Sequence, residues 1–546
     1  MTTNPYLPIL LKQRGNLLLL PLLVKSAYSF YPGKGLEAVL MRTQPVLVTG
    51  ATGYVGGRLV PRLLAAGYRV RAMARSLDKL RGRRWSDHPS LELAQADLQD
   101  PASLSKAVQG CFAAYYLVHS MNPDQREFTL ADRRAAHNFV SAIAKMKLER
   151  VIYLGGLGGE SPDSSPHLKS RAEVGKILQS GPVPVTFLRS AHILGSGSAS
   201  FEILRYLAER LLIILIPAKM MGTKVQPICI RNVLNYLVGC LEKDETIGQT
   251  FDIGGPDIIT NRRLFELYAE EAGLRKPIFI TPRFLPASTL GRKLAISLAK
   301  LLLPVPPSIA EPLLEGAASQ MAVMDDRITR IIPQELMTCR DAIRRAIQKE
   351  SLQLVETRWT DAGELKPPEW VHAGDAPYAG GTLLQGGFRV GIAASPDEVW
   401  PIISRIGGQN GWYYGDFLWQ LRGWMDNLVG GVGLRRGRRH PEHVLVGDAL
   451  DFWRVLEVYP PKRLILVAEM KLPGEAILEF NVASLGSGTE LRLCTRFRPR
   501  GLYGMLYWYA LLPFHDLLFG GMLKQVARRV DRPIIDSPHK FKPKLI

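Results

Sequence analysis

A chain of 546 residues is too long for one ordinary domain, so we expect two or three, and its 47% of hydrophobic residues is enough to fill their cores. The net charge of +19 permits acidic ligands or surfaces, but no zinc-finger or RNA-binding motif accompanies the short basic clusters at 81–84 and 435–439. We therefore expect solvated loops at these clusters and no nucleic-acid partner.

The five cysteines are scattered, with no CxxC pair. This pattern excludes a disulfide framework and a thiolate metal cluster, and it indicates a reducing, cytoplasmic compartment. His440 and His443 are three residues apart, but no cysteine or acidic cluster lies near them in the sequence. We therefore expect no metal site.

Residues 1–41 differ in character from the rest of the chain. The apolar run Leu17–Val24 is too short to cross a bilayer, and no small-residue cleavage site comes after it. We expect a disordered extension, with Met41 as the natural first residue. A weak membrane-surface anchor is the second interpretation, and it would place the protein at the periphery of the inner membrane.

The most informative stretch is Val46–Gly67. It begins with the short apolar run Val46–Val48, which predicts a buried strand, and it ends with apolar residues at helical spacing that stop at Gly67. Pro61 lies inside this helix and should kink it. The turn between strand and helix presents backbone N–H groups and a helix N-terminus, which suit a pyrophosphate. The cofactor-binding residues expected here are Thr49, Gly50, Thr52, Gly53, Tyr54, Val55 and Gly56.

Strands and helices are expected to alternate after this turn. The alternation predicts an α/β Rossmann domain with a doubly wound parallel sheet over residues 42–275. Ligand and chemistry would lie at the carboxyl ends of its strands, near Arg75, His119 and Gly155–Gly158. The expected strands cover residues 68–75, 91–100, 113–118, 151–154 and 185–191, and the expected helices 102–109 and 126–147.

Arg75 ends the second expected strand, where a dinucleotide fold meets the adenosine ribose. An acidic side chain there would hold the 2′-hydroxyl of NAD(H), whereas arginine suits the 2′-phosphate of NADP(H). No acid precedes Asp78, so we expect NADP(H) rather than NAD(H). The alternative is that Arg75 is only a solvated loop residue.

The strand–turn–helix resembles the short-chain dehydrogenase/reductase superfamily, in the atypical branch that includes NmrA-like regulators and complex I accessory subunits. The resemblance continues through Val185–Ala191, Gln226–Val233 and Thr250–Pro256. It implies that Asp97 and Leu98 flank the adenine, and that Val118 and His119 belong to the cofactor site near the nicotinamide. Several members of this branch bind NADP(H) without known turnover.

The catalytic position departs from that resemblance. Dehydrogenases of the superfamily carry a serine after the fifth strand and then Tyr-x-x-x-Lys on the next helix. Here the strand ends in Gly155–Gly159 without the serine, and His167 and Arg171 take the two helix positions, one turn apart. Three hypotheses stay open: His167 is the general acid/base; Arg171 holds a ribose or phosphate without proton chemistry; or the site binds nucleotide and catalyses nothing.

Residues 276–377 are expected to form a helical substrate-side region and a linker. The apolar and basic stretch Leu290–Leu303 fits a helix that covers a cleft or one that lies on a membrane surface. Further helices are expected at 311–324 and 341–347, and the interdomain linker at 360–374.

Residues 378–536 change to strands with a long closing helix, the order of an α+β helix-grip (START-like) domain, followed by a tail at 537–546. Gly411–Asp416 and Gly447–Arg454 resemble the DUF2867 family, which has no assigned activity. The fold would leave an apolar cavity, with Asp451, Arg454, Glu469 and His515 to orient a ligand; alternatively, Asp451 and Arg454 form a structural pair. The expected strands cover 387–393, 449–459, 463–471, 476–483 and 489–497, the helices 396–406 and 502–529, and an aromatic loop 412–424.

This organisation supports two functions. The first is an NADP(H)-dependent oxidoreductase acting on a small hydrophobic, quinone- or lipid-like substrate. The second is a non-catalytic NADP(H)-binding redox sensor or assembly factor with a protein partner. Peripheral membrane contact through the basic surface and the apolar helices is a further, weaker hypothesis.

Overall fold

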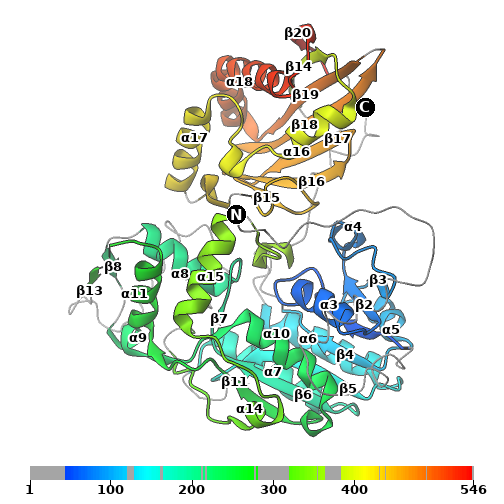
Figure 1. Cartoon of the computed structure of the whole chain (residues 1–546), viewed down its shortest axis with the longest axis vertical. Coiled ribbons are helices and arrows are strands. Elements are labelled where there is room, and N and C mark those ends of the chain that lie inside the picture. Colours follow the sequence, from blue (N-terminus) through cyan, green and yellow to red (C-terminus); the bar gives the residue numbers. More distant parts are fainter. Residues whose placement is uncertain are drawn as a thin grey trace, which may run out of the picture.

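The computed structural model consists of two bodies stacked along its long axis (Figure 1). The expectations for residues 1–41, the 290–303 helix and the later part of the linker lie outside the residues that it describes. The described residues are 44–119, 128–159, 164–210, 213–215, 218–275, 278–280, 316, 319–352, 354–362, 383–429, 431–436, 438–486 and 488–543.

The N-terminal body is built on a seven-stranded parallel sheet in the order β11-β6-β5-β4-β1-β2-β3. The chain reverses its direction of progress between β1 and β4, which is the switch point of a doubly wound fold. The predicted Rossmann architecture is therefore confirmed. The strands are β1 (Val46–Val48), β2 (Val70–Ala74), β3 (Leu91–Gln95), β4 (Ala113–Tyr116), β5 (Arg150–Gly156), β6 (Val185–Ser190) and β11 (Thr250–Ile253).

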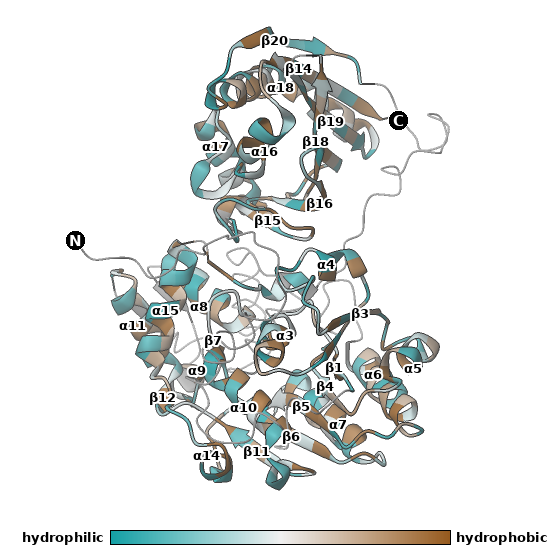
Figure 2. Ribbon diagram, turned by 45° about the vertical axis from the view of Figure 1, so that its right-hand side comes forward, coloured by the Kyte–Doolittle hydropathy of each residue, from teal (hydrophilic) through white to brown (hydrophobic). Residues whose placement is uncertain are grey.

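Helices cover both faces of this sheet. Apolar residues of α3 and α10 fill the core on one face, and those of α5, α6 and α7 fill the core on the other. In Figure 2 the hydrophobic residues concentrate on the strands and on the helix sides that face them. The helices are α3 (Gly56–Ala65), α4 (Leu77–Arg81), α5 (Pro101–Val108), α6 (Phe128–Ile143), α7 (Pro166–Gln179), α10 (Ile230–Glu242) and α14 (Arg327–Ile331).

Pro61 does not interrupt α3, which continues to Ala65. A proline leaves the carbonyl four residues before it without its helical partner. Here that carbonyl, of Gly57, accepts a hydrogen bond from the Trp85 indole at 3.3 Å. The side chain of Trp85 thus satisfies the group that Pro61 leaves open.

A smaller group of helices lies beside the sheet, on the side of the second body (Figure 1). Phe201, Tyr268 and Ile343 join α8, α11 and α15 in one core. The helix expected at 341–347 is confirmed within α15, whereas residues 319–324 form an irregular segment with a bridge from Met321 to Val225. The elements are α8 (Ala199–Arg210), α9 (Ala218–Gly222), α11 (Asn261–Glu271), α15 (Cys339–Ser351), β7 (Ile193–Leu194), β8 (Ile213–Leu215), β9 (Lys224–Val225), β10 (Ile228–Cys229), β12 (Ile259–Thr260) and β13 (Ile278–Ile280).

The C-terminal body is a seven-stranded antiparallel sheet in the order β15-β16-β17-β18-β19-β14-β20, with α16 and α18 packed on it. This arrangement is compatible with the expected helix-grip fold. None of the described helices has both the length and the apolar character needed to cross a membrane. The elements are β14 (Leu384–Ile392), α16 (Pro396–Ser404), α17 (Asp416–Leu428), β15 (Ala449–Leu450), β16 (Trp453–Tyr459), β17 (Arg463–Ala468), β18 (Gly474–Leu485), β19 (Gly488–Pro499), α18 (Gly501–Arg529) and β20 (Ile534–Phe541).

Two parts of this body differ from the sequence-based expectation. The aromatic stretch predicted as a loop contains α17, which packs Trp419 into the core of this body. Residues 534–541 form β20, an edge strand paired with β14, so the sheet extends into the segment expected to be a tail.

A packed strap, residues 354–362, lies between the two bodies and includes the first residues of the expected linker. Thr357 Oγ1 donates to the main-chain oxygen of Tyr54 at 2.7 Å, and Arg58 Nη2 donates to the main-chain oxygen of Thr357 at 3.2 Å. These bonds hold the strap against the first turn of α3.

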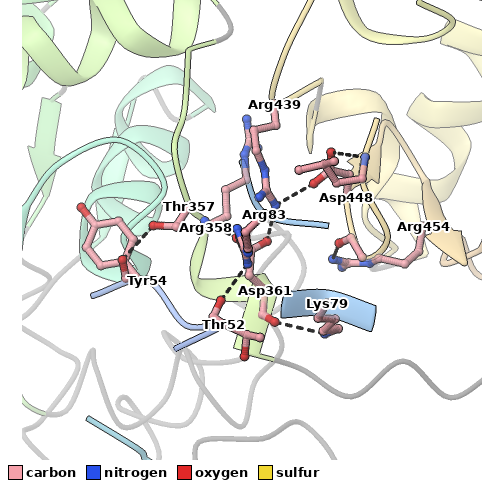
Figure 3. Close-up of polar contacts among 12 residues, drawn as sticks. Thr52, Tyr54, Lys79, Arg83, Thr357, Arg358, Asp361, Arg439, Asp448 and Arg454 are labelled. Carbon is pink, nitrogen blue, oxygen red and sulfur yellow. Dashed lines mark hydrogen bonds and ion pairs between the residues drawn. The ribbon is translucent and has the colours of Figure 1, made fainter. Parts of the chain in front are cut away.

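The carboxylate of Asp361 in the strap joins the two bodies (Figure 3). Its Oδ2 lies 3.3 Å from Arg83 Nη2 of the N-terminal body, and its Oδ1 lies 2.5 Å from Arg439 Nη2 of the C-terminal body. Arg439 also contacts Asp448, at 2.8 Å. Burial raises the pKa of Asp361, but Arg439 and Arg83 outweigh it and hold the pKa below its usual value.

The expectation that the two basic clusters are solvated is therefore wrong for three of their arginines. Arg83 and Arg439 are buried against Asp361. Arg438 is also buried, and it donates hydrogen bonds to main-chain oxygens, including that of Ser404 at 2.6 Å. Their acceptors come from distant parts of the chain and offset the cost of burying the charge.

Asp361→Ala should lower the free energy of unfolding by about 3–5 kcal/mol, because it leaves two buried guanidinium groups without their shared acceptor. Urea denaturation at pH 7 measures this loss. Because the folded pKa of Asp361 is depressed, its contribution is present above a pH of about 4 and is lost in more acidic solution. The difference between wild type and variant should therefore shrink in acid.

Asp87→Ala is the matched control, since Asp87 is exposed on the same body. It should change the free energy of unfolding by less than about 0.5 kcal/mol. Equal effects of the two substitutions would contradict the role assigned to Asp361.

Candidate nucleotide site and active site

The turn after β1 requires glycine at two of its predicted positions. Gly50 has a φ of +67°, and a Cβ on it would lie 2.9 Å from the main-chain oxygen of Leu117. A Cβ on Gly56 would lie 2.3 Å from the oxygen of Gly50. The turn thus packs directly against the end of β4, and α3 packs directly against the turn.

The predicted residues of the turn offer main-chain groups rather than side chains. Thr49 Oγ1 donates to the oxygen of Tyr115 at 2.9 Å and accepts from the nitrogen of Leu117 at 3.1 Å, so it braces β1 against β4. The Tyr54 hydroxyl is buried, which raises its pKa to about 12. Val55 precedes α3 without a side-chain cap, which leaves the helix N-terminus to an anionic group.

Basic side chains flank this turn on the side of β2. Arg75 is exposed at the end of β2, and Lys79 and Arg83 follow it at intervals of four. Burial lowers the pKa of Lys79 to about 8, and its Nζ donates to the main-chain oxygen of Asp361 at 3.0 Å. Arg83 Nη2 donates to the main-chain oxygen of Thr52 at 2.9 Å. Sequence reasoning missed Lys79 and Arg83, although their spacing from Arg75 was a signal.

Asp97 and Leu98, which the resemblance places beside the adenine, follow the end of β3. Asp97 Oδ1 accepts from the nitrogen of Gln99 at 2.9 Å and closes the turn after the strand. Leu98 is buried in the core, so its side chain does not point to the ligand edge. Asp97 therefore stays a candidate for the adenine contact, whereas the Leu98 side chain is taken up by the core.

The structure brings His119 and His167 together at the ends of β4 and α7. Their rings stack with centroids 4.8 Å apart, and His119 Nε2 lies 3.2 Å from His167 Nδ1. Asp132 of α6 places Oδ2 3.2 Å from His119 Nδ1, although the N–H does not point straight at it. Ser170 Oγ donates to the same carboxylate at 3.4 Å.

Both histidines have lowered pKa values. Burial is the main cause at His167, with His119 and Arg171 adding to it, and its pKa falls well below the usual value. Burial also lowers the pKa of His119, and the Asp132 carboxylate opposes this shift. Neutral imidazoles at pH 7 can pass a proton between them, and a neutral His167 can accept one from a ligand.

Asp132 and Ser170 were not predicted as site residues. Asp132 lies on the apolar stripe of α6 formed by Ala131, Ala135 and Phe139, where a lone acid is unusual. This position in the sequence was therefore a sign that Asp132 could be a site residue. No comparable feature of the sequence pointed to Ser170.

Arg171 lies on the same face of α7 as His167, as its spacing predicts. Its guanidinium donates to the main-chain oxygen of Leu154 and lies 5.7 Å from the centre of the Tyr153 ring. Tyr153 is buried, which raises its pKa to about 12, and its hydroxyl donates to the oxygen of Arg171. Tyr153 therefore does not replace the missing catalytic tyrosine.

A cavity of about 540 Å³ lies between the two bodies. It brings together both stretches that resemble DUF2867, because Trp412 and Asp451 line it, and Asp451 Oδ2 accepts from Trp412 Nε1 at 2.9 Å. Glu209, Tyr268 and Glu350 line its other side, from α8, α11 and α15.

The other polar groups expected to orient a ligand in the C-terminal domain lie apart from this cavity. Arg454 pairs with Glu469 at 2.9 Å and not with Asp451, so the expected Asp451–Arg454 pair is wrong. His515 is packed against Trp508 and Phe519, and burial lowers its pKa to about 4. In the part of the chain that the structure describes, no cluster of three or more histidines, cysteines and carboxylates could hold a metal ion.

Sequence comparisons match each body to a family. Residues 50–198 match the family described as "NAD(P)H-binding", and residues 378–522 match "Protein of unknown function (DUF2867)".

Curated relatives match parts of the chain. Cinnamoyl-CoA reductase 1 from Arabidopsis thaliana is 25% identical over 215 residues, which cover 38% of this chain and 62% of the relative. Dihydroflavonol 4-reductase from Dianthus caryophyllus is 31% identical over 124 residues, which cover 21% of this chain and 34% of the relative. The chain thus spans less than two thirds of the length of these relatives.

Solved structures resemble the N-terminal body only loosely. A nucleoside-diphosphate-sugar epimerase from Staphylococcus aureus is 13% identical with a TM-score of 0.45, and covers 55% of this chain and 99% of its own. A triphenylmethane reductase from Citrobacter sp. is 18% identical with a TM-score of 0.43, and covers 56% of this chain and 99% of its own. The strand order and the family matches carry the assignment without them. The chain thus joins an NAD(P)H-binding domain with a Rossmann sheet, matched at residues 50–198, to a DUF2867 domain, matched at residues 378–522.

Proposed function

We propose that the protein is an NADP(H)-dependent oxidoreductase acting on a small hydrophobic, quinone- or lipid-like substrate. The observation that carries the proposal is the stacked pair of His119 and His167 beside Asp132, at the same sheet edge as the glycine turn. A general acid/base placed there would replace the tyrosine that the chain lacks.

The chemistry follows from the protonation of this pair. With the proton of His119 on Nδ1, beside Asp132, its Nε2 accepts from His167 Nδ1–H and leaves His167 Nε2 with a lone pair. When bound, the nicotinamide cofactor accepts or supplies the hydride. In the oxidation direction, His167 Nε2 takes the hydroxyl proton of the substrate as the hydride leaves its carbon, and in reduction the imidazolium returns that proton to the oxygen. The Asp132 carboxylate stabilises the positive charge formed on His167.

The preference for NADP(H) rests on the basic edge beside the turn. Arg75 is exposed at the end of β2, with Lys79 and Arg83 further along the same side. A 2′-phosphate at this edge would meet a guanidinium rather than an acid. The NAD(P)H-binding family and the reductases of cinnamoyl-CoA and dihydroflavonol support a redox function, over the partial lengths they match.

A second candidate function is a non-catalytic NADP(H)-binding sensor or assembly factor. Arg171 is engaged with the oxygen of Leu154, so it is not poised over the sheet edge in the way a catalytic lysine would be. The strap bonds to Tyr54 of the glycine turn and to Arg439 of the C-terminal domain, so it offers a physical link between nucleotide and partner surface.

Calorimetric titration of the full chain with NADPH and NADH tests the cofactor. We expect NADPH to bind more tightly, and Arg75→Ala to weaken NADPH about 10- to 100-fold while NADH is unchanged, because a charged hydrogen bond contributes about 1.5–3 kcal/mol. Arg81→Ala is the control, since Arg81 is an exposed arginine of α4 that pairs with Asp78. Equal affinities for the two nucleotides would refute the NADP(H) preference.

Turnover with hydrophobic alcohols, carbonyls and quinones tests His167. His167→Ala should lower kcat about 10²- to 10⁴-fold and leave NADPH affinity unchanged, because the side chain acts on the proton and not on the nucleotide. Since the pKa of His167 lies well below 6.5, oxidation by the wild type should persist in mildly acidic solution.

His137→Ala, on the exposed side of α6, is the control for this loss. Unchanged turnover in His167→Ala would remove His167 from the mechanism. NADPH binding without turnover of any substrate would favour the sensor over the oxidoreductase.

A further inference from the structure

An apolar stripe of α17 faces solvent. Phe417, Leu421, Trp424, Met425 and Leu428 recur at helical spacing and are between 41% and 72% exposed. An amphipathic helix of a folded domain normally turns such a stripe into the core. Here the opposite side of α17 is the buried one, since Trp419 and Asp426 are almost fully covered.

The first half of α18 is exposed and apolar in the same way. Leu502 and Tyr503 are 72% and 74% exposed, and Leu506, Tyr509 and Phe514 are each at least half exposed. No Lys, Arg, Asp or Glu occurs from Gly501 to His515. This half of the helix therefore has no charged side chain that would favour its exposure to water.

The two stripes belong to helices that approach each other at two places in the C-terminal body. At one end of the contact, Gly415 meets Leu518 and the ring of Tyr414 meets Gly521. At the other end, both helices touch the 471–473 loop: Arg422 donates to the oxygen of Lys471 at 3.1 Å, and Gly504 packs on the oxygen of Pro473. The stripes thus form one surface, here called the apolar face.

Three basic side chains lie at the edge of the apolar face. Lys471 is exposed in the loop between the helices, and the side chain of Arg500 is 75% exposed, in loose contact with Glu475 at 3.7 Å. Lys524 is exposed two turns after Leu517 on the same side of α18. Together with the net charge of +19, these residues favour an anionic partner.

An anionic lipid bilayer matches this combination better than a second copy of the chain. Trp and Tyr prefer the boundary between water and hydrocarbon, and lysine and arginine contact anionic headgroups. A symmetric contact between two copies through this face would bring the basic side chains at its edge in one copy close to those at the edge in the other, and like charges oppose that approach. Contiguous exposed apolar patches on folded domains mark interaction sites.

We propose that the apolar face docks the protein on anionic membranes, with Phe417, Trp424 and Tyr503 entering the bilayer interface. Lys471 and Arg500 then contact the headgroups. This docking goes beyond the proposed oxidoreductase activity and does not depend on it, since it requires neither nucleotide nor turnover.

Co-sedimentation of the full chain with vesicles tests the proposal. We expect binding to phosphatidylcholine vesicles containing 30% phosphatidylglycerol (about one lipid in three, to supply surface charge) and much weaker binding to pure phosphatidylcholine. The triple variant Phe417→Ser, Trp424→Ser, Tyr503→Ser should lose at least about tenfold in vesicle affinity, with its thermal stability unchanged, because these side chains are exposed. Lys471→Ala with Arg500→Ala should weaken binding only to the anionic vesicles.

The matched control is Ile258→Ser, Met324→Ser, Leu352→Ser, whose side chains are 56%, 91% and 62% exposed but lie on the N-terminal body. It should bind vesicles like the wild type. If the first triple variant is unstable, quenching by lipids with brominated acyl chains, compared between wild type and Trp424→Phe, reports entry of Trp424 directly.

Absence of vesicle binding, or equal losses in the two triple variants, would overturn the proposal. So would a dimer in sedimentation equilibrium that the first triple variant abolishes, because that result assigns the apolar face to a second copy of the chain.

Discussion

The arrangement of the two domains depends on one buried carboxylate. The Asp361 carboxylate forms ion pairs with Arg83 of the first domain and Arg439 of the second, two residues that are far apart in the chain. In a buried site of low dielectric constant a charge without a partner is strongly destabilising, so the carboxylate and the two guanidinium groups stabilise one another. Arg83 also donates to the main-chain oxygen of Thr52, so its side chain connects the Asp361 carboxylate to the glycine turn. The strap that carries Asp361 bonds to Tyr54 of the same turn. Domain docking and the nucleotide turn are therefore parts of one hydrogen-bonded unit.

Much of the fold could be predicted because local patterns determine it. Short apolar runs between amphipathic helices predict a buried parallel sheet, and the structure has those strands within a few residues. The burial of Arg83 and Arg439 could not be predicted, since a cluster of arginines looks the same in a loop whether or not a distant carboxylate meets it. α17 was missed for another reason: its aromatic residues and Gly423 have low helix propensity, and packing overrides propensity there.

The candidate site shows the same division. Spacing alone placed His167 and Arg171 on one face of α7, and the glycines predicted the turn after β1. The contact between His119 and His167, and the approach of Asp132, depend on how α6 and α7 pack across the ends of β4 and β5. Such distances between elements are tertiary and leave little trace in a single sequence.

The positions of the three features constrain how a hydrophobic substrate could be handled. The apolar face lies on the C-terminal domain, the histidine pair lies in the N-terminal domain, and the cavity of about 540 Å³ lies between the domains, lined by both. A substrate taken up from a bilayer would have to cross the junction that Asp361 holds together. The cavity at this junction is lined by charged side chains from both domains, among them Arg205, Glu209 and Asp451, so a path through it would be polar. The Asp361 carboxylate, which joins the domains, would then also fix the geometry of that path. Membrane docking, transfer of the substrate and its reaction at the histidine pair would therefore all depend on this one connection between the domains.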